Sequence, residues 1–288
     1  LFFLRGINRN SFLRKRRTMC LPVRRANIIV NGANIPCNTL LSYKIALMQG
    51  ADVIELDVSR SKDGKFFVFH PGMEPVLLKC GKYISEMTAQ EVGELTVLNS
   101  DDTPTGYRIP TLAEAFSLLK DKVYIIVDKF WTDIPGITEE IRRAGVEKQV
   151  IVKTWVDEKT VSEVENHVSD LMFMAIVGRQ DKGTTEMLLN SNVNYIGNEI
   201  LFETEEDEVA GDEYIQKLHD HGLLVWVNPI VYDEKAVITA GHTDDCSLQY
   251  GPDHGWGWLI DKKVDFLQTD WLLMLKEYLR QREENGRL

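Results

Sequence analysis

Two acidic side chains on one face of a predicted strand are the first candidates for chemistry. The segment DVIELDV, residues 52–58, has the apolar, β-branched composition of a buried strand. Because alternate side chains of a strand face opposite sides, Glu55 and Asp57 share one face. Two buried carboxylates are costly unless protons or a cation neutralise them. Since all-oxygen ligands favour Mg2+ or Ca2+, we expect a divalent cation there; an internal ion pair with Lys129 or Lys153 is the alternative.

A histidine at the end of the next predicted strand is the candidate general acid or base. Residues 62–65, KDGK, have the composition of a tight turn. The following strand, 66–70, ends in His70, and Pro71 stops it. A histidine beside an acidic site can move protons near neutral pH, which favours catalysis; a purely structural role for His70 is the alternative.

The elements that must position these residues follow a regular alternation from residue 26 onward. Predicted strands cover residues 26–30, 52–58, 66–70, 123–128, 149–154, 171–176, 194–197, 223–228 and 264–269. Predicted helices cover residues 38–49, 88–95, 111–120, 134–144, 157–166, 183–191, 207–221, 254–262 and 271–283. Strand–helix alternation repeated about eight times predicts an α/β fold, and the count favours a closed (β/α)8 TIM barrel over an open sheet. The glycine-rich motifs of dinucleotide and P-loop nucleotide binding are absent from the sequence.

The long stretch after the seventh predicted strand of the barrel is less regular. Residues 229–258 are long for a βα loop, and we expect a solvated loop anchored by Trp256 and Trp258. The alternative is a second polar site formed by His242, Asp244 and Asp245 at the catalytic end of the barrel.

Charge is unevenly distributed along the 288 residues, whose formal net charge is −11. Residues 1–51 hold nine Lys and Arg and no acid, whereas the rest holds 24 Lys and Arg against 44 Asp and Glu. We expect residues 1–22 to be a basic N-terminal arm and residues 23–288 to be one barrel domain. The arm is either simply solvated or contacts nucleic acid or anionic lipid, with the barrel as a scaffold. The acidic body argues against nucleic acid as the main partner.

Cysteine usage and hydropathy bear on the cell compartment. The four cysteines show no CxxC spacing, which argues against a structural zinc site and a disulfide scaffold and favours a reducing compartment. No run of 18 apolar residues occurs, so no transmembrane segment is expected. A cytoplasmic location is the prediction.

In its motifs the sequence resembles the glycerophosphodiester phosphodiesterase family. The main match is PCNTLLSYKIALMQGADVIELDVSRSKDGKFFVFH, residues 36–70. Shorter matches are IPTL at 109–112, YIIVDK at 124–129, WVN at 226–228 and QTD at 268–270, so that the resemblance covers about residues 24–283. The resemblance implies a (β/α)8 barrel and a metal-dependent phosphoric diester hydrolase of lipid metabolism. Its substrate would be a small glycerophosphodiester, cleaved to sn-glycerol 3-phosphate and an alcohol.

The family's roles pass to matching positions of this sequence. Glu55, Asp57 and Asp128 match the metal ligands, although Asp128 could instead pair with Lys129 at the strand end. His70 matches the second of two catalytic histidines. The residues implied as substrate contacts are Arg25, Lys129, Lys153 and Trp226. The alternative role of Lys129 and Lys153 is to neutralise the buried Glu55 and Asp57. The alternative for Trp226 is a structural position in the hydrophobic core.

The chain also departs from the family pattern near its beginning. The family carries His-Arg-Gly at the end of the first strand, but this sequence has no histidine before His70, and Arg24 and Arg25 stand nearest to that motif. Cys37 replaces the glutamate of the family's P-E-N-T, and Pro71 replaces the aspartate of its H-D. Losing one acid–base group typically costs about 100- to 10,000-fold in rate. Two hypotheses therefore remain: an active hydrolase, and a catalytically inactive barrel that binds a phosphate-bearing ligand or partner.

Overall fold

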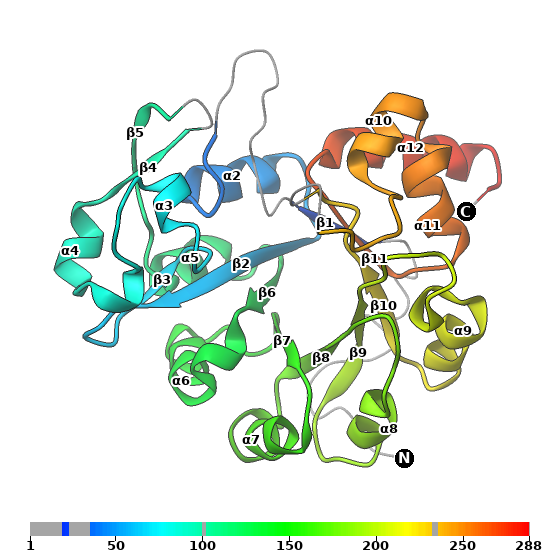
Figure 1. Cartoon of the computed structure of the whole chain (residues 1–288), viewed down its shortest axis with the longest axis horizontal. Helices are drawn as coiled ribbons and strands as arrows, with labels where there is room; N and C mark the ends of the chain where they lie inside the picture. The colour runs from blue at the N-terminus through cyan, green and yellow to red at the C-terminus, as the bar shows by residue number, and fades with distance from the viewer. Residues whose placement is uncertain (1–18, 23–34, 100–101, 232–235, 288) are drawn as a thin grey trace. The chain divides into compact units, whose positions relative to one another are not determined.

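The computed structural model describes residues 19–22, 35–99, 102–231 and 236–287 (Figure 1). The chain divides into two compact units, which we call the amino-terminal unit (23–150) and the carboxyl-terminal unit (151–288 with 1–22). Each is described by itself. The predicted strand at 26–30, the basic cluster at 14–17, and Arg24 and Arg25 lie outside the described residues.

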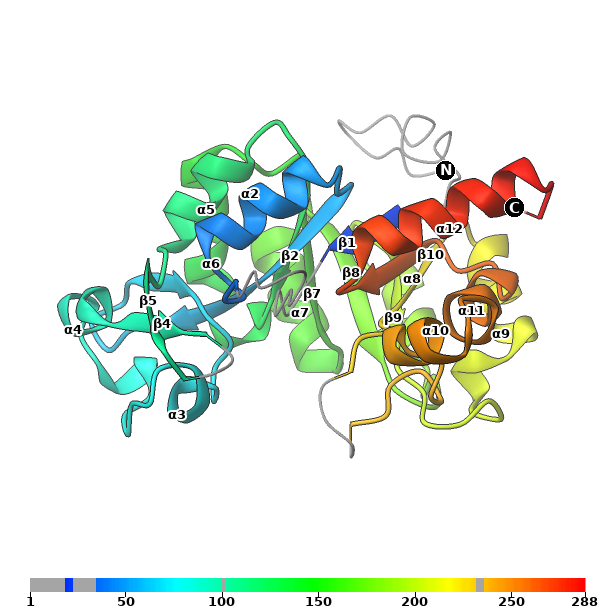
Figure 2. The same ribbon diagram turned by 90° about the horizontal axis from the view of Figure 1, so that it is seen from above.

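The amino-terminal unit contains a short mixed sheet, a small hairpin and several helices. In chain order its elements are α2 (Leu40–Met48), β2 (Val53–Arg60), β3 (Phe66–Val68), α3 (Glu74–Leu77), η1 (Ile84–Glu86), α4 (Ala89–Glu94), β4 (Thr96–Leu98), β5 (Pro104–Arg108), α5 (Leu112–Leu119), β6 (Tyr124–Asp128), η2 (Phe130–Thr132) and α6 (Ile134–Ala144). Strand β2 pairs in parallel with β6 and antiparallel with β3, while β4 and β5 form the hairpin. Helices α2 and α5 lie side by side in this unit (Figure 2).

Strand β3 differs from the expected barrel strand at 66–70. It ends at Val68 and runs antiparallel to β2, with Val58 opposite Val68. The link between the two strands is a tight turn in which the Ser61 backbone N–H donates to the Lys65 carbonyl at 2.8 Å. Because a parallel connection needs a crossover of a dozen residues or so, a turn this short permits only antiparallel pairing.

Local sequence signals explain where the helices of this unit begin. Thr111 caps α5 by accepting the Glu114 backbone N–H at 3.2 Å, and the Glu114 carboxylate accepts the Thr111 N–H at 2.7 Å. These reciprocal hydrogen bonds form a capping box. Thr88 and Glu91 form the same arrangement at α4. Beneath α3 and α4, a cluster of apolar side chains is buried: Phe67, Phe69, Leu78, Ile84, Met87, Val92, Val97 and Ile109.

The carboxyl-terminal unit is built on a parallel sheet with strand order β1-β11-β10-β9-β8-β7. Its elements are β1 (Met19–Pro22), β7 (Val150–Trp155), α7 (Glu158–Val168), β8 (Met172–Val177), α8 (Thr184–Leu189), β9 (Tyr195–Ile200), η3 (Glu208–Ala210), α9 (Asp212–Asp220), β10 (Leu224–Val227), α10 (Asp244–Tyr250), η4 (Asp253–Gly257), α11 (Trp258–Asp261), β11 (Phe266–Thr269) and α12 (Leu272–Glu284). Strand β1 takes up the last four residues of the segment expected to be an arm, and α12 lies beside it (Figure 2).

The α/β class and the parallel strands are confirmed, because strands β6 to β11 recur at predicted positions and helices separate them. Closure of eight strands into one barrel, the single domain at 23–288 and the arm at 1–22 stay predictions. The expectation of a solvated loop at 229–258 is wrong for much of that stretch, where α10, η4 and the start of α11 form. Among the described residues, no helix is long and apolar enough to cross a membrane.

Candidate active site

Three buried carboxylates mark the end of the parallel strand pair in the amino-terminal unit. Glu55 and Asp57 lie on β2 and Asp128 is the last residue of β6; each exposes only 1 % of its surface. Asp57 and Asp128 are register partners across the two strands. Because partners in a parallel pair face the same side and Glu55 is two residues from Asp57, all three side chains share one face of the sheet.

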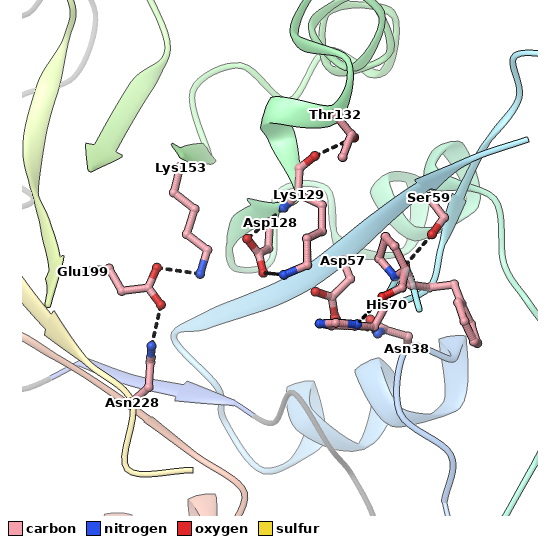
Figure 3. Close-up of polar contacts among 12 residues, drawn as sticks. Asn38, Asp57, Ser59, His70, Asp128, Lys129, Thr132, Lys153, Glu199 and Asn228 are labelled. Carbon is pink, nitrogen blue, oxygen red and sulfur yellow. Dashed lines mark hydrogen bonds and ion pairs between the residues drawn. The ribbon is translucent and has the colours of Figure 1, made fainter. Parts of the chain in front are cut away.

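A lysine contacts Asp128, whereas a neutral amide contacts Asp57. The Lys129 ammonium lies 3.1 Å from Asp128 Oδ2, and the Lys129 backbone N–H donates to Asp128 Oδ1 at 2.8 Å. The predicted alternative for Asp128, a pair with Lys129, is therefore present. Asp57 Oδ2 instead accepts a hydrogen bond at 3.0 Å from the neutral amide of Asn38 (Figure 3). Burial, and then the charge of Asp57, hold the pKa of the nearby Tyr43 hydroxyl well above its ordinary value.

His70 follows β3 and is half-buried. Its Nδ1 lies 2.9 Å from the Pro71 carbonyl oxygen, which can only accept, so Nδ1 carries a proton and Nε2 holds the lone pair of the neutral ring (Figure 3). The Phe69 N–H donates to the Asp57 carbonyl at 3.0 Å, and the Ser59 hydroxyl donates to the Phe69 carbonyl at 2.9 Å. Two hydrogen bonds thus tie the residue before His70 to the strand that carries the acids.

The carboxyl-terminal unit holds a second buried polar cluster, built from β7, β9 and the end of β10. The Lys153 ammonium lies 2.7 Å from Glu199 Oε2 and 4.2 Å from the ring centre of Trp226. The Asn228 amide donates to Glu199 Oε1 (Figure 3). All four side chains are buried. Trp226 is completely buried, which agrees with the alternative that this side chain belongs to the core.

Glu199 is the polar residue that the sequence analysis missed. The available signal was a charged side chain inside the apolar strand YIGNEI, the same signal that identified Glu55. Of the predicted substrate contacts, the structure places Lys129 beside Asp128 and Lys153 beside Glu199 and Trp226, whereas Arg25 lies outside the described residues.

The second polar site considered as the alternative at His242, Asp244 and Asp245 forms no single cluster among the described contacts. Asp244 is buried and accepts hydrogen bonds from the Trp256 indole, the Thr269 hydroxyl and the Asp270 backbone N–H at 2.6 to 2.8 Å. His242 instead stacks on Trp258 and lies 2.8 Å from Glu205. Asp244 therefore has a structural role, because its hydrogen bonds join α10 to the end of β11.

The three acids of the amino-terminal unit suit a hard cation in their chemistry. Carboxylate oxygens are preferred ligands of Mg2+ and Ca2+, and their burial calls for positive charge. Within the described ranges, no group of three His, Cys, Asp or Glu side chains is arranged to hold an ion by itself. The donor types are those of a divalent-cation site, although the described side chains are not gathered into one; Asp57 and Asp128 are the two that strand register brings level with each other.

Comparisons with known proteins give one consistent picture. A glycerophosphodiester phosphodiesterase from Caldanaerobacter subterraneus subsp. tengcongensis is 32 % identical over 130 residues, which are 42 % of this chain and 54 % of that relative. The chain thus matches about half the length of this curated relative. Residues 173–279 match a family described as a domain of unknown function, DUF4996.

Solved structures share the fold. A glycerophosphoryl diester phosphodiesterase from Parabacteroides distasonis has a TM-score of 0.72 and 17 % identity, covering 92 % of this chain and 86 % of that one. An Oleispira antarctica phosphodiesterase in complex with the product sn-glycerol-3-phosphate has a TM-score of 0.63 and 17 % identity, covering 93 % and 98 %. The resemblance to the glycerophosphodiester phosphodiesterase family is confirmed, because the chain is similar in sequence to proteins of that name and has the fold of their solved structures.

Proposed function

We propose that the chain is a metal-dependent phosphoric diester hydrolase that cleaves glycerophosphodiesters to sn-glycerol 3-phosphate and an alcohol. The observation that carries this proposal is the set of three buried acids on β2 and at the end of β6, with the residue before His70 tied to β2. The names of the relatives and the product bound by the Oleispira antarctica enzyme support the substrate class. A closed (β/α)8 barrel in a single domain is part of the proposal.

Glu55, Asp57 and Asp128 would hold the cation, Mg2+ or Ca2+. Such an ion supplies positive charge against a phosphoryl oxygen. The chain's own residues supply proton transfer: with Nδ1 held by the Pro71 carbonyl, His70 would act as the imidazolium, which gives the proton on Nε2 to the leaving alcohol and keeps the proton on Nδ1. The two lysines would contact the phosphate of the substrate. Each would also stay paired with an acid, Lys129 with Asp128 and Lys153 with Glu199.

The remaining assignments are carried by the resemblance. Arg25 would add a phosphate contact, and Trp226 would form a wall of the substrate pocket. The substrate is a small molecule, and the proposal involves no nucleic acid. A cytoplasmic location is consistent with the thiols of Cys80 and Cys246, neither of which is in a disulfide.

The experiment is a choline-release assay with the purified chain, glycerophosphocholine and Mg2+ or Ca2+. We expect turnover that a chelator abolishes. His70→Ala should lower kcat by about 100- to 10,000-fold, because the leaving alcohol loses its proton donor. His221→Ala, at an exposed histidine of the other unit, is the matched control and should leave kcat unchanged. Absence of choline release under all metal conditions would refute the hydrolase.

A catalytically inactive barrel is the second candidate, favoured by the absence of any histidine before His70. In that case calorimetry would detect binding of glycerophosphocholine while the choline assay stays at background. Turnover that His70→Ala removes would exclude this candidate.

A further inference from the structure

We propose that Asn38 is a positioning residue that orients the Asp57 carboxylate toward the cation, and that Tyr43 holds the Asn38 amide in the required orientation. The inference rests on the proposed function, since it takes Asp57 to be a metal ligand. Asn38 and Tyr43 lie in the segment 36–70 that resembles the family, but the resemblance assigns a role to neither.

The contacts form a continuous chain within the amino-terminal unit. Asn38 Nδ2 donates to Asp57 Oδ2 at 3.0 Å, and the Tyr43 hydroxyl donates to Asn38 Oδ1 at 2.8 Å (Figure 3). A carboxylate can only accept, so the NH2 end of the amide must face Asp57 and the carbonyl end must face Tyr43. All three residues are buried, with 8 %, 3 % and 1 % of their surfaces exposed for Asn38, Tyr43 and Asp57. Water therefore competes little for these hydrogen bonds.

The backbone at Asn38 is held in an unusual conformation. Its φ is +54°, in the left-handed region that costs most residues energy and that Asn tolerates better than most. Thr39 immediately begins α2: its side chain accepts the Ser42 N–H at 3.2 Å and donates to the Pro36 carbonyl at 2.9 Å. The helix cap thus secures the residue next to Asn38. Strained backbone of this kind persists where the surroundings hold a side chain in place.

The chemistry of the partner matters for a metal ligand. Lys129 brings a positive charge to Asp128, which offsets part of that carboxylate's charge. Asn38 brings none, so its hydrogen bond fixes one oxygen of Asp57 without adding a positive charge. Hydrogen-bonding partners behind metal ligands typically change metal affinity by about 10- to 100-fold when they are removed.

The central variant is Asn38→Gly, because glycine accepts a positive φ and removes only the amide. Isothermal calorimetry with Mg2+ and with Ca2+ gives the dissociation constant of the full chain. We expect weaker binding by about 10- to 100-fold. The matched control is Asp121→Gly, at an exposed residue of the same unit with φ +62°, and it should bind as the wild type does. Circular dichroism checks that each variant is folded.

Tyr43→Phe is the second variant, and it keeps the inference testable if the glycine variant does not fold. It leaves the amide in place but removes the hydroxyl that orients it, so we expect a smaller loss of metal affinity than with Asn38→Gly. In the choline assay both variants should raise the metal concentration needed for half-maximal rate more than they raise the KM for glycerophosphocholine.

The outcomes separate this inference from the proposed function. If the wild type binds the cation and both variants bind it equally well, the positioning role is wrong while the proposed function stands. If the wild type binds neither Mg2+ nor Ca2+, the proposed metal dependence fails, and the positioning role fails with it.

Discussion

The three buried acids Asp128, Asp57 and Glu199 differ in the side chains that they contact. Asp128 lies against a lysine of its own strand end, Asp57 accepts from a neutral amide, and Glu199 shares its carboxylate between Lys153 and Asn228. The Lys153–Glu199 contact is an ion pair between buried side chains of two strands, β7 and β9. Removing one member of such a pair leaves an uncompensated buried charge, which costs more than the pair itself contributes.

The Lys153–Glu199 pair gives a prediction for single residues. Lys153→Met or Glu199→Gln alone should lower the free energy of unfolding by about 3 kcal/mol or more, because each leaves one buried charge. The double variant should lose less than the sum of the two, since neither charge is then left alone. Urea unfolding of the four proteins measures this coupling. Purely additive losses would mean that the 2.7 Å contact does not link the two side chains energetically.

At the scale of elements, an error in a predicted strand boundary explains why Glu199 was not identified from the sequence. The predicted strand 194–197 ended at Gly197, whereas β9 continues to Ile200 and so carries Glu199 into the buried sheet. A glycine inside a strand usually suggests a bulge or an end, and the pairing of β9 with β8 does shift register between Tyr195 and Gly197. The strand on the other side explains why the residue is a glycine. A Cβ on Gly197 would lie 2.0 Å from the Leu224 carbonyl oxygen, on the register partner in β10.

Gly197→Ala therefore tests why this glycine is there. Because the clash is with backbone, β9 and β10 must separate, and we expect a loss of about 3 kcal/mol or more in the free energy of unfolding. Gly178→Ala is the matched control in the same unit, since its Cβ would meet only the Trp155 ring at 3.8 Å. We expect a change of less than about 1 kcal/mol there. Equal thermal melting temperatures for the two variants would contradict the explanation that residue 197 must be glycine because of its close approach to Leu224.

The predicted part of the site is the part with local signals. Alternation in residues 52–58 was enough to place Glu55 and Asp57 together, and strand register then brought Asp128 level with Asp57. The contacts that complete the picture are long-range: Lys153 meets Glu199 across 46 positions, and Asn38 meets Asp57 across 19. No periodicity within one element carries such information, because the pairing arises only when separate elements pack. Helix α10 was missed although Thr243 caps it and two aspartates follow, which is an ordinary helix-start signal.

At the scale of the whole molecule, one buried acid links folding to pH. Asp244 accepts three hydrogen bonds that join α10, η4 and the end of β11. Burial is the largest influence on this carboxyl and raises its pKa to about 7, against 3.8 for an exposed aspartate. The folded state therefore binds a proton that the unfolded state releases. Its contribution to stability is fully present below about pH 4 and is lost as pH rises through about 7.

The corresponding prediction compares the wild type with Asp244→Asn across pH. Asparagine does not titrate, so the unfolding free energy of the wild type relative to the variant should fall by up to about 1.4 kcal/mol per pH unit between about pH 5 and about pH 7. Groups that both proteins share cancel in this difference. One of them, the exposed Glu277, stays ionised throughout, because hydrogen bonds from Arg280 lower its pKa to about 2. Urea unfolding at each pH measures the difference. A constant gap between the two proteins would show that Asp244 is already ionised in the folded state at pH 5, and that its three donors outweigh the cost of burial.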